Sequence, residues 1–231
     1  SLTDIEQIAL AIKKCDKKLL PTGTAAGAEV MAKYWLAGIE KERDAVHLDK
    51  LPRLIISGTA TKITANQIKK LEKSEDYNEI CFIALEAKTI IDGINHGIDD
   101  SLVNHIVENF SNTSTVCIHT SDLIANFDGF SDDSFEAELT KEKFAGMITD
   151  YLAELTKKVT DRVKVLLILL GGETSYKCCR AMNINELRLI DEVAPAISLC
   201  QDINNNLIIT KSGNLGNSNT LIDILNYLKN H

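Results

Sequence analysis

The sequence lacks the cysteine and histidine spacings that build disulfide frameworks and zinc sites. Its six cysteines include no C-x-x-C pair, and its five histidines are scattered over 231 residues. We therefore predict reduced, mostly buried thiols and no zinc site. No apolar run is long enough to cross a bilayer, and the N-terminus has no signal-peptide pattern. These absences favour a globular protein of the cytoplasm without a membrane partner.

Positive charge is also in deficit. The chain has 25 lysines and arginines against 33 aspartates and glutamates, which gives a formal net charge of −8. This balance argues against nucleic acid or an anionic membrane surface as the main partner. An acidic chain that binds a phosphate ligand must hold it with local backbone N–H groups and a few lysines.

Strand-like and helical patterns alternate along most of the chain. The alternation predicts an α/β protein: a three-layer fold with helices on both faces of a sheet whose strands are mostly parallel or mixed. Apolar, β-branched runs predict strands at 18–21, 51–58, 78–85, 115–120, 163–170, 187–190 and 207–210. Helices are expected at 4–14, 87–94, 102–110, 141–158 and 220–229. Two further helices are expected to end at residues 35 and 182, and an acidic surface loop is expected at 126–138.

The most informative stretch is 170–175, Leu-Gly-Gly-Glu-Thr-Ser, at the end of a buried strand pattern. Two glycines allow a sharp turn and close approach of a ligand, and Glu-Thr-Ser suits the first turn of a helix. A strand, a glycine turn and a helix start are how α/β proteins build a phosphate site. A plain strand-to-helix turn with a capped helix has the same pattern, so both interpretations stay open at this point.

Two further strand patterns end in small residues. Residues 57–61 read Ser-Gly-Thr-Ala-Thr, and residues 211–218 read Lys-Ser-Gly-Asn-Leu-Gly-Asn-Ser before the last helix. If the three strands are close together, their turns open on one edge of the sheet, where ligands of open α/β sheets bind. The lysine in the third turn would place one cation there, or would remain a solvated surface lysine.

These motifs, in this order and spacing, resemble the nucleotide-binding domain of the four-carbon acid sugar kinases, a family first catalogued as one of unknown function. The turn at 20–27 also resembles the passage between the two domains of that family. The resemblance implies an ATP-dependent kinase that uses Mg²⁺ and phosphorylates a small sugar acid such as threonate, erythronate or an oxo-tetronate. It implies a nucleotide site at Thr59, Thr61, Gly171, Gly172, Glu173, Thr174, Ser175, Lys211, Gly213 and Gly216, with no protein metal ligand and no assigned catalytic residue.

The resemblance also implies a division of the chain. Residues 1–45 are expected to be a crossover segment from an N-terminal substrate domain that this sequence lacks, and residues 46–231 the nucleotide-binding domain. The substrate domain would then be a missing or separate partner, and a homo-oligomer is a further option. Isolated, this chain is expected to be inactive as a kinase.

Some residues depart from the family pattern. Ala196 stands where a glycine is usual in a Pro-Gly-x-Pro turn, Leu215 where an aromatic residue is usual, and Asn219 where an aspartate is common. We expect nucleotide binding to be retained despite these changes, whereas they count against kinase turnover. Three hypotheses follow: the ATP domain of a sugar-acid kinase, a stand-alone or degenerate nucleotide-binding module without transferase activity, and an unrelated α/β binding protein whose glycine turns are structural.

Overall fold

The computed structural model describes the whole chain except residues 39–47, 49–50, 59–60, 121–122, 125–139 and 231. The predicted acidic loop at 126–138 and Thr59 therefore lie outside the described residues. The chain divides into two compact units, Ser1–Asp44 and Ala45–His231, and each is described by itself.

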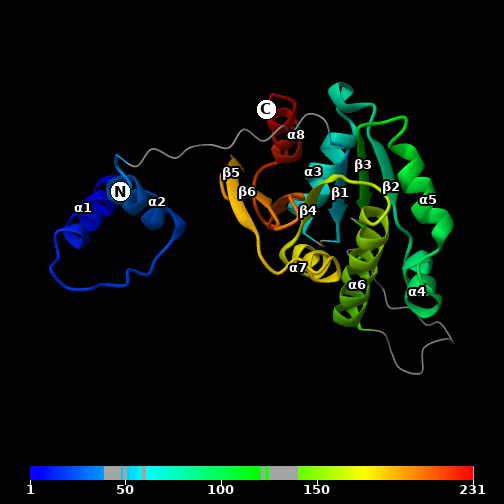
Figure 1. Cartoon of the computed structure of the whole chain (residues 1–231), viewed down its shortest axis with the longest axis horizontal. Helices are drawn as coiled ribbons and strands as arrows, with labels where there is room; N and C mark the ends of the chain where they lie inside the picture. Colours follow the sequence, from blue (N-terminus) through cyan, green and yellow to red (C-terminus); the bar gives the residue numbers. More distant parts are fainter. Residues whose placement is uncertain (39–47, 49–50, 59–60, 121–122, 125–139, 231) are drawn as a thin grey trace. The chain divides into compact units, whose positions relative to one another are not determined.

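The first unit contains two helices, α1 (Leu2–Lys13) and α2 (Ala25–Trp35), which contact each other (Figure 1). Among its described residues only Ala9 and Val30 are buried apolar side chains. The strand predicted at 18–21 is wrong, because this segment has no strand conformation. A strand needs a hydrogen-bonded neighbour, and none pairs with this segment in the part of the chain that the structure describes.

The second unit is built on a sheet of seven strands in the order β2-β3-β1-β4-β7-β6-β5. The first five strands of this order are parallel to one another, β6 is antiparallel to β7, and β5 is antiparallel to β6. The strands are β1 (Arg53–Ser57), β2 (Cys81–Ala84), β3 (Thr115–His119), β4 (Leu166–Leu170), β5 (Arg188–Ala194), β6 (Ile197–Gln201) and β7 (Leu207–Lys211).

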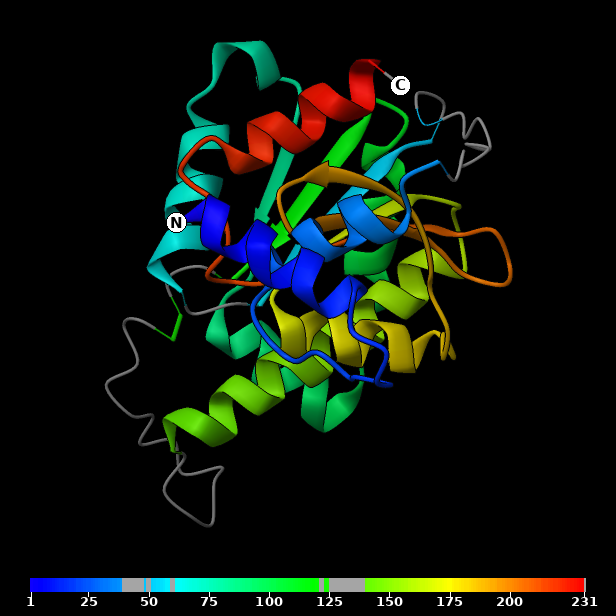
Figure 2. The ribbon, with the colours of Figure 1, turned by 90° about the vertical axis from the view of Figure 1, so that its left-hand side faces the viewer.

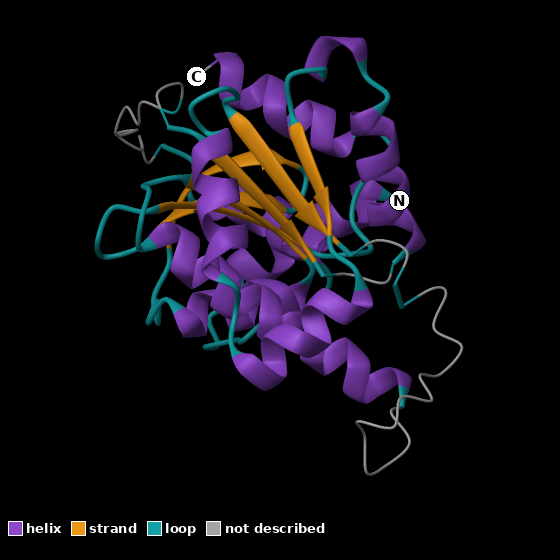
Figure 3. Ribbon diagram, turned by 90° about the vertical axis from the view of Figure 1, so that its right-hand side faces the viewer, coloured by secondary structure: helices purple, strands orange, loops and turns teal. Residues whose placement is uncertain are grey.

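Helices cover both faces of this sheet, which confirms the three-layer α/β prediction (Figures 1 and 3). Alternate residues of β1 show the division: Leu54 and Ile56 belong to one buried cluster, and Ile55 belongs to the other. The first cluster packs under α4 (Ala87–His96), α5 (Asp100–Asn109), α6 (Lys141–Thr160) and α7 (Gly172–Ala181). The second packs under α3 (Lys62–Glu72), the 3₁₀ turn η1 (Glu75–Tyr77) and α8 (Thr220–Asn230). Figure 2 shows α8 in red and α6 in green on opposite sides of the strands.

The strand predicted at 187–190 overlaps the start of β5, and β6, which was not predicted, pairs with β5 in a hairpin. A tight turn at Pro195–Ala196 joins them, and Ala196 has φ of +60°. The sequence contains no Asn-Gly or Asp-Gly signal at this turn, and its resemblance to the family's Pro-Gly-x-Pro turn was the one cue to a reversal of the chain here. The two added strands extend the sheet on the far side of β7 and leave the β1-β4-β7 centre parallel.

Candidate functional site

The site begins with the register of three neighbouring strands. Ser57 pairs with Leu170, and Leu170 pairs with Lys211, so β1, β4 and β7 end level with one another. The turns that follow at Gly58, Gly171 and Gly213 therefore open on the same edge of the sheet, as expected from the sequence on the condition that the three strands are close together. Figure 3 shows the strands running toward this shared edge between the helical layers.

A cavity of about 310 Å³ lies at this edge. It brings together residues from the ends of β1, β4 and β7 with residues of α6 and with Ile124, which follows β3 in the chain. Its lining consists of Gly58, Thr61, Ile124, Ala145, Thr149, Gly171, Gly172, Glu173, Thr174, Gly213 and Asn214.

The first rim of the cavity is residues 171–174, which we call the glycine turn. Gly171 has φ of +110°, a conformation that L side chains rarely adopt, and it is the N-cap of α7. Its N–H donates to the carbonyl of Lys211 at 2.8 Å, which ties the turn to the next strand. No side chain caps α7, so the helix presents its first-turn N–H groups at the cavity.

Two glycines in the lining have different surroundings. A Cβ added at Gly172 meets no heavy atom within 4 Å, so the space beside it is open. A Cβ added at Gly58 would lie 2.7 Å from Leu152 Cδ1 and 3.0 Å from Thr174 Oγ1. A side chain at Gly58 would therefore have to displace the side chains of Leu152 and Thr174, whereas Gly172 leaves room on the cavity side.

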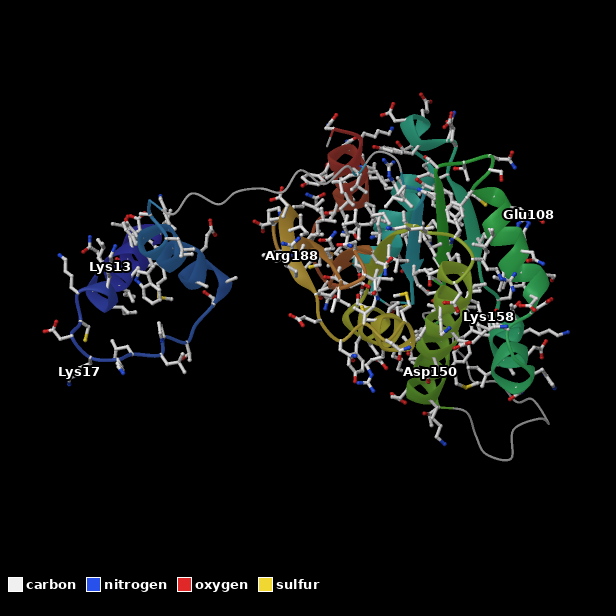
Figure 4. The ribbon with its side chains drawn as sticks, in the orientation of Figure 1. Lys13, Lys17, Glu108, Asp150, Lys158 and Arg188 are labelled. Atoms are coloured by element: carbon white, nitrogen blue, oxygen red, sulfur yellow. The ribbon has the colours of Figure 1, made fainter. Side chains whose placement is uncertain are left out.

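Glu173 is the only carboxylate among the described residues of the lining. Its side chain is 63% exposed and pairs with Lys177 at 3.5 Å, and Lys177 also pairs at 2.7 Å with Asp150 of α6 (labelled in Figure 4). Lys177 therefore links α7 to α6 and balances part of the negative charge beside the cavity. Across the part of the chain that the structure describes, no group of three or more His, Cys, Asp or Glu side chains gathers to hold a metal.

The second rim is residues 212–217 between β7 and α8, which we call the terminal loop. Side chains of α3 and its N-cap bind its carbonyl groups. Thr61 Oγ1 and Thr64 Oγ1 both donate to the carbonyl of Gly213, at 2.7 and 2.8 Å. Gln67 Nε2 donates to the carbonyls of Leu215 and Asn217, at 3.1 and 2.8 Å.

Lys211 lies beneath the terminal loop and is only 1% exposed. Its ammonium donates to the carbonyl of Ser212 at 2.9 Å, to the carbonyl of Leu215 at 3.3 Å and to Thr64 Oγ1 at 3.2 Å. Burial lowers the pKa of this ammonium to about 8, because a charged group is poorly solvated there. Among the described residues no carboxylate forms an ion pair with it.

The structure brings most of the predicted site residues into one lining: Thr61, Gly171, Gly172, Glu173, Thr174 and Gly213. Three others lie next to it. Ser175 Oγ donates to the carbonyl of Gly171 at 2.8 Å, Lys211 faces the terminal loop, and Gly216 has φ of +83° and packs against Thr220. Thr59 is not among the described residues.

Four lining residues were not predicted from the sequence: Ile124, Ala145, Thr149 and Asn214. Ala145 and Thr149 lie one turn apart on α6, and the buried pattern of that helix indicates packing only. Asn214 lies inside the motif used for the resemblance, so its position after Gly213 was the one available signal. No described helix is long and apolar enough to be a membrane span.

The comparison with protein families decides the assignment. The model described as nucleotide-binding C-terminal domain matches residues 54–221, which include both rims of the cavity. The chain belongs to this family. The fold and the cavity at the edge of the sheet are those of a nucleotide-binding C-terminal domain in this chain. The comparison with curated proteins found no match.

Solved structures share the fold of this nucleotide-binding domain. A Haemophilus influenzae protein of the DUF1537 family, which is the four-carbon acid sugar kinase family, superposes with a TM-score of 0.72 at 19% identity, over 100% of this chain and 51% of its own. A Salmonella typhimurium LT2 protein named as a tRNA synthase gives 0.70 at 13% identity, over 96% and 50%. A DUF1537 protein of Bordetella bronchiseptica, a domain-swapped dimer with bound citrate, gives 0.58 at 16% identity, over 99% and 51%. The chain thus spans about half the length of these relatives.

Proposed function

We propose that this chain binds ATP at the shared edge of β1, β4 and β7 and serves as the nucleotide domain of a kinase for four-carbon sugar acids. The observation that carries the proposal is the cavity itself, which lies between the N-terminus of α7 and the terminal loop. Both rims carry backbone N–H groups that can bind an anion, so anion binding there does not require a surface of net positive charge.

Phosphate groups suit the glycine turn because the first-turn N–H groups of a helix attract anions. The open space beside Gly172 allows a phosphate to approach the backbone closely. Ile124 and Ala145 supply apolar surface elsewhere in the same lining, which suits the base of a nucleotide. This arrangement accounts for nucleotide binding by a chain with a net charge of −8.

Mg²⁺ would accompany the phosphates. It prefers oxygen ligands and usually keeps several waters, so few protein ligands are needed. Glu173 is the lining residue that could contact it directly or through water. In phosphoryl transfer the ion would neutralise charge on the phosphate oxygens, while this chain's own groups bind and orient the nucleotide.

The sugar acid would be held elsewhere. The chain spans about half of each solved relative, and the Bordetella bronchiseptica relative has a small polycarboxylate, citrate, bound. We assign residues 46–231 to the nucleotide domain and residues 1–45 to the crossover from a substrate domain. The domain-swapped dimer of that relative makes a homo-oligomer a further proposal for this chain.

Two assays test the proposal. Calorimetry of ATP with Mg²⁺ should show saturable binding by the chain, and no heat at millimolar nucleotide would contradict the site. A coupled ADP-release assay with threonate, erythronate and oxo-tetronate should show little turnover by this chain alone. Positioning of the acceptor can supply roughly 7–11 kcal/mol of the barrier, and adding the substrate domain should restore it.

The alternative is a nucleotide-binding module without transferase activity. Both hypotheses predict ATP binding, so the ADP-release assay separates them. Turnover restored by a substrate domain, in the same chain or added separately, supports the kinase. Binding that never leads to sugar-dependent ADP release, whatever domain is added, supports the module.

A further inference from the structure

The ammonium of Lys211 is buried, and all the hydrogen-bond partners that the described residues give it are neutral. Its three hydrogen-bond acceptors are the carbonyls of Ser212 and Leu215 and the hydroxyl of Thr64. An ammonium has three donors and no acceptor, so these contacts use its full capacity. The lysine is absent from the cavity lining and lies under the loop that forms the rim.

The neighbouring side chains make the same kind of contact. Thr61, Thr64 and Gln67 donate to the carbonyls of Gly213, Leu215 and Asn217. Gln67 Oε1 is buried and has no hydrogen-bond partner among the described residues, so only the two donors of this amide are satisfied. An unpaired buried acceptor is costly, which indicates that the amide is oriented for the loop carbonyls.

Because of the geometry of the peptide unit, these contacts to carbonyl groups also fix the direction of the N–H groups beside the cavity. In a trans peptide the C=O and N–H groups point in opposite directions. When the carbonyls of Ser212 and Gly213 point toward Lys211 and α3, the N–H groups of Gly213 and Asn214 point away from them. Gly213 and Asn214 both line the cavity, and no recorded hydrogen bond of the described residues uses either N–H.

We infer that Lys211 is a positioning residue: with Thr64 and Gln67 it holds the terminal loop so that the N–H groups of Gly213 and Asn214 are available to an anion. Lys211 therefore acts on a phosphate through the loop and does not bind it. The consequence for ATP rests on the proposed function, whereas the holding of the loop is a property of the ligand-free chain.

The primary test is amide hydrogen exchange of the ligand-free chain. Lys211→Met keeps a long side chain but removes all three donors, and Gln67→Leu removes two donors at similar volume. Each variant should speed exchange of the Leu215 and Asn217 amides, whose N–H groups donate to the carbonyl of Ser212 and to Thr220 Oγ1, roughly tenfold or more, while β1 and β4 keep their protection. Unchanged exchange in the terminal loop of both variants would overturn the inference.

The control is Lys158→Met. Lys158 is labelled in Figure 4 and also donates to a backbone carbonyl, that of Ile98 at 3.3 Å, but it belongs to α6 and not to the terminal loop. Its loss should leave the exchange of residues 212–217 unchanged. If Lys211→Met lowers protection throughout the chain, Gln67→Leu decides the matter by the same criterion.

Binding assays separate positioning from direct contact. For a positioning lysine, Lys211→Met should weaken ATP binding by roughly tenfold, leave adenosine binding unchanged and loosen the ligand-free loop. A direct phosphate ligand would weaken ATP binding with normal exchange in the ligand-free loop, which would contradict the inference. If wild-type chain binds no ATP, the proposed function fails, and the exchange experiment still decides the role of Lys211.

Discussion

The glycine turn and the terminal loop form opposite rims of one cavity, but they are held by different means. The glycine turn follows from backbone geometry: Gly171 adopts φ of +110°, and α7 begins directly after it. The terminal loop has little regular structure of its own and depends on side chains of Lys211, Thr64 and Gln67. The first rim is fixed by the backbone conformation of Gly171 and a backbone hydrogen bond to Lys211, whereas the second is fixed mainly by side chains outside the loop.

This difference predicts how each rim responds to mutation. The glycine turn should be sensitive to added volume at its own positions and insensitive to distant side chains. The terminal loop should respond to the loss of donors in α3 and to the charge state of a buried lysine.

Gly172→Val should abolish ATP binding, with affinity reduced by roughly a hundredfold or more, about 3 kcal/mol. The open space next to Gly172 accepts the side chain in the folded chain, and the same space is then closed to a phosphate. Calorimetry and thermal unfolding measure the two effects. Gly27→Val in α2 is the control, because its added Cβ also meets nothing within 4 Å.

Normal ATP binding by folded Gly172→Val would show that the glycine turn is only a strand-to-helix connection. The comparison of the two rims would then fail at the turn, and the terminal loop would remain the only candidate for an anion contact.

Gly216→Ala should destabilise the terminal loop by roughly 2–4 kcal/mol, because alanine would have to adopt a positive φ there and its Cβ would overlap the side chain of Thr220. Gly216 is not a lining residue, so the effect on ATP must pass through the loop. Urea unfolding measures the stability, and hydrogen exchange measures the loop. A variant of unchanged stability would mean that Thr220 moves aside at little cost.

The stability of the chain should depend on pH through Lys211. Its pKa is about 8 in the folded chain and returns toward 10.5 on unfolding, so the unfolded state holds more protons between these values. The free energy of unfolding should therefore rise with pH from 8 to 10.5, by at most on the order of 3 kcal/mol from this group. Lys211→Met lacks this contribution.

Denaturant unfolding of wild type and Lys211→Met at pH 7 and pH 10 isolates the effect, because the other lysines are common to both chains. The stability difference between the two chains should shift in favour of wild type at the higher pH. A difference that does not change with pH would show that the Lys211 ammonium is better solvated than its burial indicates.

Ala196→Gly should stabilise the chain by roughly 1 kcal/mol without changing ATP binding. Ala196 has φ of +60°, which costs an L residue about 1–2 kcal/mol and costs glycine nothing comparable. The β5–β6 turn belongs to neither rim, so this variant is the reference for a turn whose conformation matters for stability alone. Thermal unfolding and calorimetry together would reveal any unexpected link to the cavity.

The sequence by itself determined the local chemistry of this protein. Alternating apolar strands and amphipathic helices specified a three-layer α/β fold, and small residues after three strands specified turns at Gly58, Gly171 and Gly213. These features are local, because strand and helix periods and the conformational freedom of glycine are readable within a few residues. The predicted strand at 18–21 failed because pairing needs a partner that local pattern does not reveal.

Only the tertiary structure decided how these pieces meet. The level ends of β1, β4 and β7 placed the three turns together, and α6 contributed Ala145 and Thr149 to the lining. The role of Lys211 was also decided there: its sequence position after a strand suits a phosphate ligand, but burial under the terminal loop directs its ammonium to carbonyl groups 2.9 and 3.3 Å away. The physical reason is that an ammonium on a flexible stem binds whichever acceptors the fold places around it.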